Sequence, residues 1–226
     1  MNFLYYLKYF YFISINWNFR LAFFTVSHEI RGEKKYNIQS VELNRLKTLQ
    51  INSENLIHSS IYQAANYYLI EKSFDYLRSI NANKNIVDFG CGKGRVLAVA
   101  AYYGFTEITG IDFAKALCEV AQRNISKTKS LFPSTRFTVI CDDAVNYQVR
   151  QDENVFFFFN PFDEIVMLPV VKNILKSLKE KSRIVHIVYL NPVHKEILLS
   201  AGFEEEYYFK KLEYLEISIL SNKLEE

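Results

Sequence analysis

Three of the chain's seven glycines fall within five residues, at Gly90, Gly92 and Gly94. They come directly after the apolar run 85–89, and a helical pattern of apolar residues over 95–103 follows them. Glycine adopts positive φ at little cost and lets another group approach the backbone closely. The sequence therefore predicts a strand that turns tightly beneath a ligand and then enters a helix.

A negatively charged residue beside this loop indicates which kind of ligand the loop can bind. Asp88 stands two residues before the first glycine, and the spacing is Gly-x-Gly-x-Gly, with Arg95 where a dinucleotide fingerprint has its late glycine. A carboxylate here would repel a phosphate but would suit a cationic or amine-bearing ligand. Lys93 and Arg95 can in turn meet a carboxylate, or they can simply face solvent.

A second acid, Asp112, ends the apolar run 107–112, 18 residues beyond Gly94 (112 − 94). An acid near this spacing binds the two ribose hydroxyls in nucleoside-binding α/β domains, because its two oxygens match two vicinal donors. We expect this role for Asp112, with the next residue, Phe113, also at the ligand. The alternative is that Asp112 or a neighbour caps the helix that starts at residue 115.

The third candidate strand, 137–141, is followed by Asp142, Asp143 and Ala144. A carboxylate here can accept a hydrogen bond from an adenine amino group, while Ala144 offers a backbone N–H. We favour Asp143, with Asp142 as the rival. A solvated turn is the alternative.

A fourth polar position follows the run 154–159, which contains Phe156 to Phe159 and predicts a strand buried on both faces. Asn160 is then the first polar side chain at the carboxyl end of the sheet, and it offers both a donor and an acceptor. Pro161 stiffens the backbone, and Phe162 can form a wall of a substrate site. The alternative is an Asn-Pro turn that starts the next helix.

The rest of the pattern predicts an α/β fold with a doubly wound, mostly parallel sheet. Further strands are expected at 183–190 and in an antiparallel hairpin, and further helices between the strands. Pro169 predicts a kink or a later helix start. The ranges are 203–209 and 214–220 for the hairpin, and 115–127 and 164–178 for the helices. We expect an aromatic N-terminal arm at 1–35, a helical lead-in or cap at 36–84, and a binding domain at 85–226.

The composition of the chain limits the kinds of ligand and compartment that are expected. The net charge of +2 lacks the strongly basic footprint of a protein that binds many phosphates. Three cysteines, an odd number and widely spaced, indicate a reducing compartment, and no histidine or cysteine spacing predicts a metal site. We expect a cytoplasmic protein.

The first 26 residues are crowded with aromatic side chains and carry only Lys8 and Arg20 as charges. They fit neither a signal peptide nor a membrane span. We interpret them as an aromatic helix packed on the domain or on a second subunit. Peripheral membrane contact is the alternative.

Together, these strand ends resemble the class I S-adenosylmethionine-dependent methyltransferase family over residues 85 to about 220. The resemblance implies a seven-stranded sheet and S-adenosylmethionine as the cofactor. It assigns the methionine part to the loop, the ribose and adenine to the next two strand ends, and the transferred methyl to the fourth. The residues are Asp88, Gly90, Cys91, Gly92 and Gly94; Asp112 and Phe113; Asp143 and Ala144; and Asn160, Pro161 and Phe162.

The run Asn160-Pro161-Phe162 is similar to the Asn/Asp-Pro-Pro-aromatic motif of methyltransferases that modify amino nitrogens, with one proline missing. The hypothesis is methylation of a nitrogen acceptor by direct displacement, with Asn160 as the catalytic residue and Pro161 and Phe162 at the substrate. The acceptor stays open between protein, nucleic acid and small molecule. Two alternatives are a non-catalytic Rossmann-like interaction module and a nicotinamide-dependent oxidoreductase.

Overall fold

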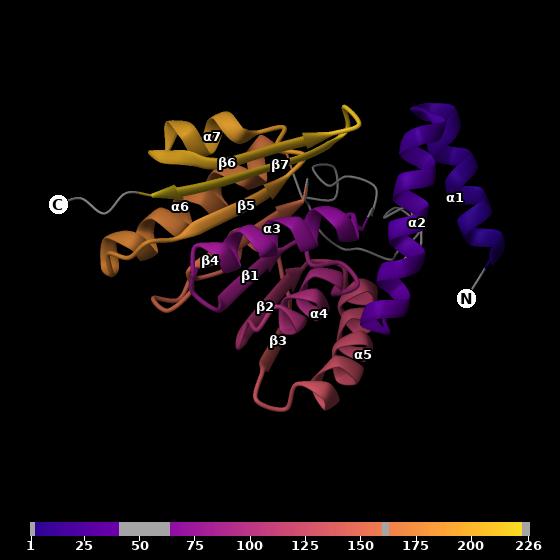
Figure 1. Cartoon of the computed structure of the whole chain (residues 1–226). Coiled ribbons are helices and arrows are strands. Elements are labelled where there is room, and N and C mark those ends of the chain that lie inside the picture. Colours follow the sequence, from indigo (N-terminus) through magenta and orange to yellow (C-terminus); the bar gives the residue numbers. More distant parts are fainter. Residues whose placement is uncertain (1–2, 41–63, 160–162, 223–226) are drawn as a thin grey trace.

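The computed structural model describes residues 3–40, 64–159 and 163–222, and in them a seven-stranded sheet forms the centre of the molecule (Figure 1). Its strand order is β3-β2-β1-β4-β5-β7-β6. The first five strands in this order run parallel to one another. Strand β7 runs antiparallel to both of its neighbours, β5 and β6. The prediction of a mostly parallel, doubly wound sheet is confirmed. The bounds are β1 (Asn85–Phe89), β2 (Glu107–Asp112), β3 (Arg136–Cys141), β4 (Val155–Phe159), β5 (His186–Leu190), β6 (Phe203–Lys211) and β7 (Leu215–Asn222).

The central strand β4 is covered on both faces, as its run of phenylalanines predicts. Phe156 and Phe158 pack into one apolar cluster, and Phe157 points to the opposite face and packs into the other. The register aligns Phe89 of β1 with both Ile111 of β2 and Phe158 of β4. The carboxyl ends of these three strands therefore lie side by side, and the segments that follow β1 and β2 meet at one edge of the sheet.

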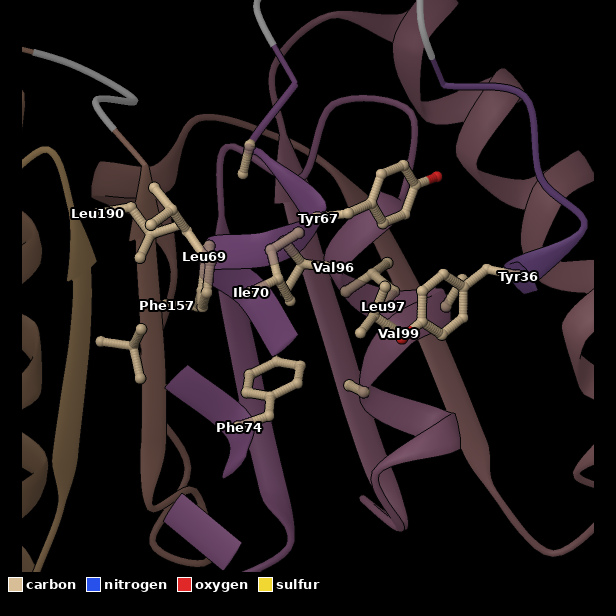
Figure 2. Close-up of a cluster of buried hydrophobic side chains, with 14 of the residues drawn as sticks. Tyr36, Tyr67, Leu69, Ile70, Phe74, Val96, Leu97, Val99, Phe157 and Leu190 are labelled. Atoms are coloured by element: carbon tan, nitrogen blue, oxygen red, sulfur yellow. The ribbon is translucent and has the colours of Figure 1, made fainter. Parts of the chain in front are cut away.

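Helices cover both faces of the sheet (Figure 1). Figure 2 shows the layer on one face, where Leu69, Ile70 and Phe74 pack with Val96 and Leu97 and with Phe157 of the sheet. The opposite face is covered by α6 and α7. The bounds are α3 (Tyr67–Ser79), α4 (Arg95–Tyr102), α5 (Lys115–Leu131), α6 (Glu164–Glu180) and α7 (Lys195–Ser200).

Helix α6 runs through Pro169 and begins at Glu164. The expected alternative of a later start is therefore wrong. The reason is the cap, since Asp163 Oδ1 accepts hydrogen bonds from the backbone N–H groups of Ile165 and Val166, at 3.0 and 3.4 Å. This cap fixes the first turn ahead of the proline.

The N-terminal arm is a pair of helices, α1 (Phe3–Asn16) and α2 (Phe19–Tyr36), where the sequence suggested a single aromatic helix (Figure 1). Asn18 caps α2 by accepting from Leu21 N at 2.8 Å. The inner side chains of the pair belong to the same apolar cluster as the sheet, so the arm packs on the domain. They are Tyr6, Tyr9, Ile13, Leu21, Ala22 and Val26. Across the described ranges, no helix has the length and apolar character needed to span a bilayer.

Gly32 lets α2 lie close to α3. A Cβ added at Gly32 would stand 2.3 Å from the ring of Tyr67, which is itself buried. Since real side chains do not approach this closely, only glycine fits without moving the helix or the ring.

We predict that Gly32→Ala lowers the free energy of unfolding by about 1–3 kcal/mol, because the clash outweighs the better helix propensity of alanine. Chemical denaturation measures it. Ser27→Ala, on the exposed side of the same helix, is the control and should change stability by less than about 0.5 kcal/mol. A Gly32→Ala protein as stable as wild type would mean that α2 does not dock in this way.

Candidate active site

The loop after β1 depends on its three glycines. Gly90, Gly92 and Gly94 have φ values of 79°, 52° and 77°, in the left-handed region that side chains disfavour. The amides of Gly90 and Cys91 both donate to Ile111 O at 2.9 Å, which fastens the loop to the end of β2. The sequence prediction of a tight turn is confirmed.

A further glycine, Gly110 of β2, makes room beneath this loop. A Cβ added there would lie 2.6 Å from Leu97 Cδ1 and 2.8 Å from Cys91 Cβ. The Cys91 side chain is buried at this contact. The Cys91 side chain therefore packs inside the domain beneath the loop.

Asp112 links the ends of β1 and β2. Its Oδ2 accepts from Gly92 N at 2.8 Å, and its Oδ1 accepts from Ala114 N at 2.9 Å. A carboxylate has about four lone-pair sites, so each oxygen keeps capacity for one more donor. The cap residue of α5 is Ala114, so the alternative of Asp112 as a helix cap is not what the structure shows.

Two carboxyl groups lie buried together here. Asp88 is 3% exposed and Asp112 is 7% exposed. Burial raises the pKa of Asp112 to about 6, even though two backbone N–H groups oppose the shift. Burial, together with the nearby charge of Asp112, raises the pKa of Asp88 well above its usual value. A bound cation would offset both penalties, so the acids fit a positively charged ligand.

The end of β3 lies next to that of β2, because Cys141 is the register partner of Asp112. Asp143 is half-buried, and its Oδ1 accepts from Val145 N at 3.1 Å. Asp142 is exposed, and its Oδ1 accepts from Asp143 N at 2.7 Å and from Asn146 Nδ2 at 3.0 Å. Both acids therefore help to hold the turn, and Asp143 is the less exposed of the two.

The structure brings the first three predicted groups together along one edge of the sheet, on β1, β2 and the turn after β3. Phe113 is half-buried and Ala144 is buried within this set. Asn160, Pro161 and Phe162 lie outside the described residues.

Arg95, the first residue of α4, meets a carboxylate of the chain itself. Its guanidinium donates to both oxygens of Glu29 on α2, with Nη1–Oε1 2.9 Å and Nη2–Oε2 2.6 Å. It also donates from Nε to Ser40 Oγ at 2.8 Å and from Nη1 to Ala65 O at 2.6 Å. The guanidinium lies over the Tyr67 ring at 4.0 Å. Arg95 and Lys93 are both buried, so the alternative that they face solvent is wrong.

A second acid of α2, Glu33, completes this contact. Its Oε1 accepts from Ser40 N at 2.9 Å, Ser40 Oγ at 2.7 Å and Tyr67 OH at 3.0 Å. It lies 3.7 Å from Arg95 Nη2. Glu29 and Glu33 were not among the residues predicted from the sequence. The available signal was that Glu29 is the first acidic residue of the chain, after 28 residues without one.

A side chain of α5 also holds the glycine loop in place. Asn124 Nδ2 donates to Lys93 O at 2.9 Å and to Gln39 O at 3.2 Å. The loop is thus framed by α5 on one side and by the arm on the other.

We predict that Glu29→Ala lowers the free energy of unfolding by about 3–5 kcal/mol, because it leaves the guanidinium of Arg95 buried without its carboxylate. Chemical denaturation measures this loss, and Asp152→Ala is the control, because both members of the Asp152–Arg150 pair are exposed and its removal should cost far less. The double variant Glu29→Met with Arg95→Met should lose less than the two single changes together. Strict additivity would contradict a direct pair.

Comparison with known proteins agrees with the geometry. Residues 86–183 match the family model described as a methyltransferase domain. No curated protein sequence matches the chain at a significant level.

Solved structures share the fold at low sequence identity. A "putative RNA methyltransferase" from Pyrococcus horikoshii is 16% identical, with a TM-score of 0.55, and the match covers 86% of this chain and 96% of that one. A ribosomal protein L11 methylase from Lactobacillus delbrueckii subsp. bulgaricus is 13% identical, with a TM-score of 0.50 and coverages of 69% and 78%. Magnesium protoporphyrin IX methyltransferase from Synechocystis is 12% identical, with a TM-score of 0.51 and coverages of 72% and 90%. Residues 86–183 therefore match a methyltransferase domain, and the chain shares the fold of these solved methyltransferases.

Proposed function

We propose that the enzyme methylates a nitrogen atom of a protein or a nucleic acid by direct displacement, with S-adenosylmethionine as the methyl donor. The observation that carries the proposal is the edge of the sheet where Asp88, the glycine loop and Asp112 meet beside the end of β4. The cofactor supplies an electrophilic methyl group on a positively charged sulfur. The protein then needs to align the acceptor and to exclude water.

The cofactor would be held by groups with matching chemistry. The glycine loop lets the methionine part come close to the backbone. The two remaining acceptor sites of Asp112 fit the two ribose hydroxyls. Asp143 and the Ala144 N–H fit the adenine amino group and a ring nitrogen. Burial raises the pKa of Asp88 and Asp112, and a nearby positive charge would favour their ionised forms, in keeping with a cationic ligand.

The acceptor side of the proposal depends on Asn160. It follows β4 in the chain, and β4 ends beside β1, because Phe158 and Phe89 are register partners. An amide oxygen there can accept a hydrogen bond from the nucleophilic nitrogen and orient its lone pair, while Pro161 and Phe162 would wall the acceptor. The name of one structural neighbour refers to RNA and that of another refers to a ribosomal protein. We therefore propose both nucleic acids and proteins as acceptor classes.

We predict that the affinity for S-adenosylhomocysteine falls about tenfold between about pH 7 and about pH 5, because only the ionised Asp112 accepts both hydroxyls and its pKa is about 6. Calorimetric titration measures it. Asp112→Asn should bind weakly with a flatter profile. Wild-type affinity that stays constant over this range would contradict the assignment.

Asp112 should also make the stability of the unliganded protein depend on pH. Stability should fall as the pH rises, whereas cofactor affinity should rise. Its pKa is raised from 3.8 to about 6 on folding, so the folded state binds the proton more tightly than the unfolded state. The contribution of Asp112 to stability is therefore greatest below about pH 4 and declines as the pH rises to about 6, by about 3 kcal/mol. Comparison of wild type with Asp112→Asn isolates this contribution in chemical denaturation.

We predict different effects for two alanine variants. Asp112→Ala should weaken cofactor binding by about 1–3 kcal/mol, since it removes hydrogen bonds to a charged group. Asn160→Ala should leave cofactor affinity unchanged and slow turnover. Incubation with methyl-labelled cofactor and cell extract would identify the acceptor class, and wild-type turnover by Asn160→Ala would remove its catalytic role.

A further inference from the structure

The outer face of the α1–α2 pair is an exposed apolar surface. On α1 the exposed positions recur with helical spacing, and they continue onto the start of α2. We call this set the outer patch, and its members are Leu4, Leu7, Tyr11, Phe12, Ile15, Trp17, Phe19 and Phe23. The most exposed of them is Ile15, at 78%. Figure 1 shows the two helices side by side at one end of the molecule.

A helix that is apolar on both sides needs a second covering surface. The inner side of α1 is already covered, because Tyr6, Tyr9 and Ile13 are buried in the apolar cluster that α2 also joins. The opposite side is exposed, although Trp17 at the end of the patch contacts Tyr214. Contiguous apolar patches of this kind mark an interaction surface.

The charged side chains that lie among the patch residues on α1 and the start of α2 are both cations. Lys8 and Arg20 are exposed within it, and no acidic residue precedes Glu29, which is buried against Arg95. A second copy of the same patch would bring like charges together. An anionic surface would be attracted by both cations.

The aromatic residues also fit a lipid surface. Trp17 and Tyr11 are the side-chain types that prefer the boundary between hydrocarbon and water. Trp17 is held by edge contacts with Phe12 and Tyr214, with ring centroids 5.9 and 6.5 Å apart. The buried pair Arg95–Glu29 keeps α2 on the domain. The helices can therefore lie on a bilayer while remaining docked on the protein.

We propose that the outer patch binds the surface of a lipid bilayer that contains anionic phospholipids. The apolar side chains would enter the interfacial layer, and Lys8 and Arg20 would contact the headgroups. This surface is separate from the cofactor residues, so the proposal does not depend on the acceptor.

The test is co-sedimentation of the full chain with phosphatidylcholine vesicles that contain or lack phosphatidylglycerol. The apolar variant replaces Ile15, Phe19 and Phe23 by serine, and the charge variant replaces Lys8 and Arg20 by glutamine. The matched control replaces Leu131, Ile165 and Leu168 by serine, since these are exposed at comparable levels elsewhere on the protein. Binding of S-adenosylhomocysteine and the unfolding midpoint show that each variant is folded.

Wild type should bind the anionic vesicles more tightly than the neutral ones. The apolar variant should lose binding at least tenfold, and the charge variant should bind anionic vesicles about 30-fold more weakly. The control variant should bind like wild type. Absence of wild-type binding to anionic vesicles would overturn the proposal. So would equal loss in the control, or a wild-type dimer that the apolar variant converts to a monomer without any vesicle binding.

Discussion

The ion pair between Arg95 and Glu29 connects the two parts of this molecule. Both side chains are 3% exposed, so each charge has lost its water and depends on the other. Arg95 directly follows Gly94, and Glu29 lies near the middle of α2, so the pair fixes the start of α4 against α2. The guanidinium also donates hydrogen bonds to Ser40 Oγ and to the carbonyl of Ala65, and it stacks over the Tyr67 ring. A buried ion pair contributes little to stability compared with an apolar substitute, but it specifies one geometry.

This arrangement also separates charges around the glycine loop. The guanidinium of Arg95 points to the arm and is neutralised there by Glu29, with Glu33 nearby. Asp88 and Asp112 lie buried at the ends of β1 and β2, and burial raises the pKa of each. The ligand side of the loop is therefore acidic although a cation follows the last glycine. A sulfonium nucleoside meets this requirement, whereas a pyrophosphate would face two carboxyl groups.

Much of the architecture could be predicted from the sequence, because strands buried in a parallel sheet have short apolar sequences such as 155–159. The glycine loop and the order of Asp88, Asp112 and Asp143 were also predictable, since each acid lies at or just beyond the carboxyl end of its strand. The contact of Arg95 with Glu29 was not, because 66 residues separate the two and no spacing rule connects them. Local capping decided other points: Asp163 starts α6 ahead of Pro169, and Asn18 divides the arm into two helices.

The central claim is that the edge formed by β1, β2 and β3 binds an S-adenosyl nucleoside. A crystal structure of the full chain with S-adenosylhomocysteine tests it most directly. The account predicts that the two ribose hydroxyls lie within hydrogen-bond distance of the Asp112 carboxylate, with the amino acid part over Gly90 to Gly94. A nucleoside bound elsewhere, or one whose ribose points away from Asp112, would contradict it.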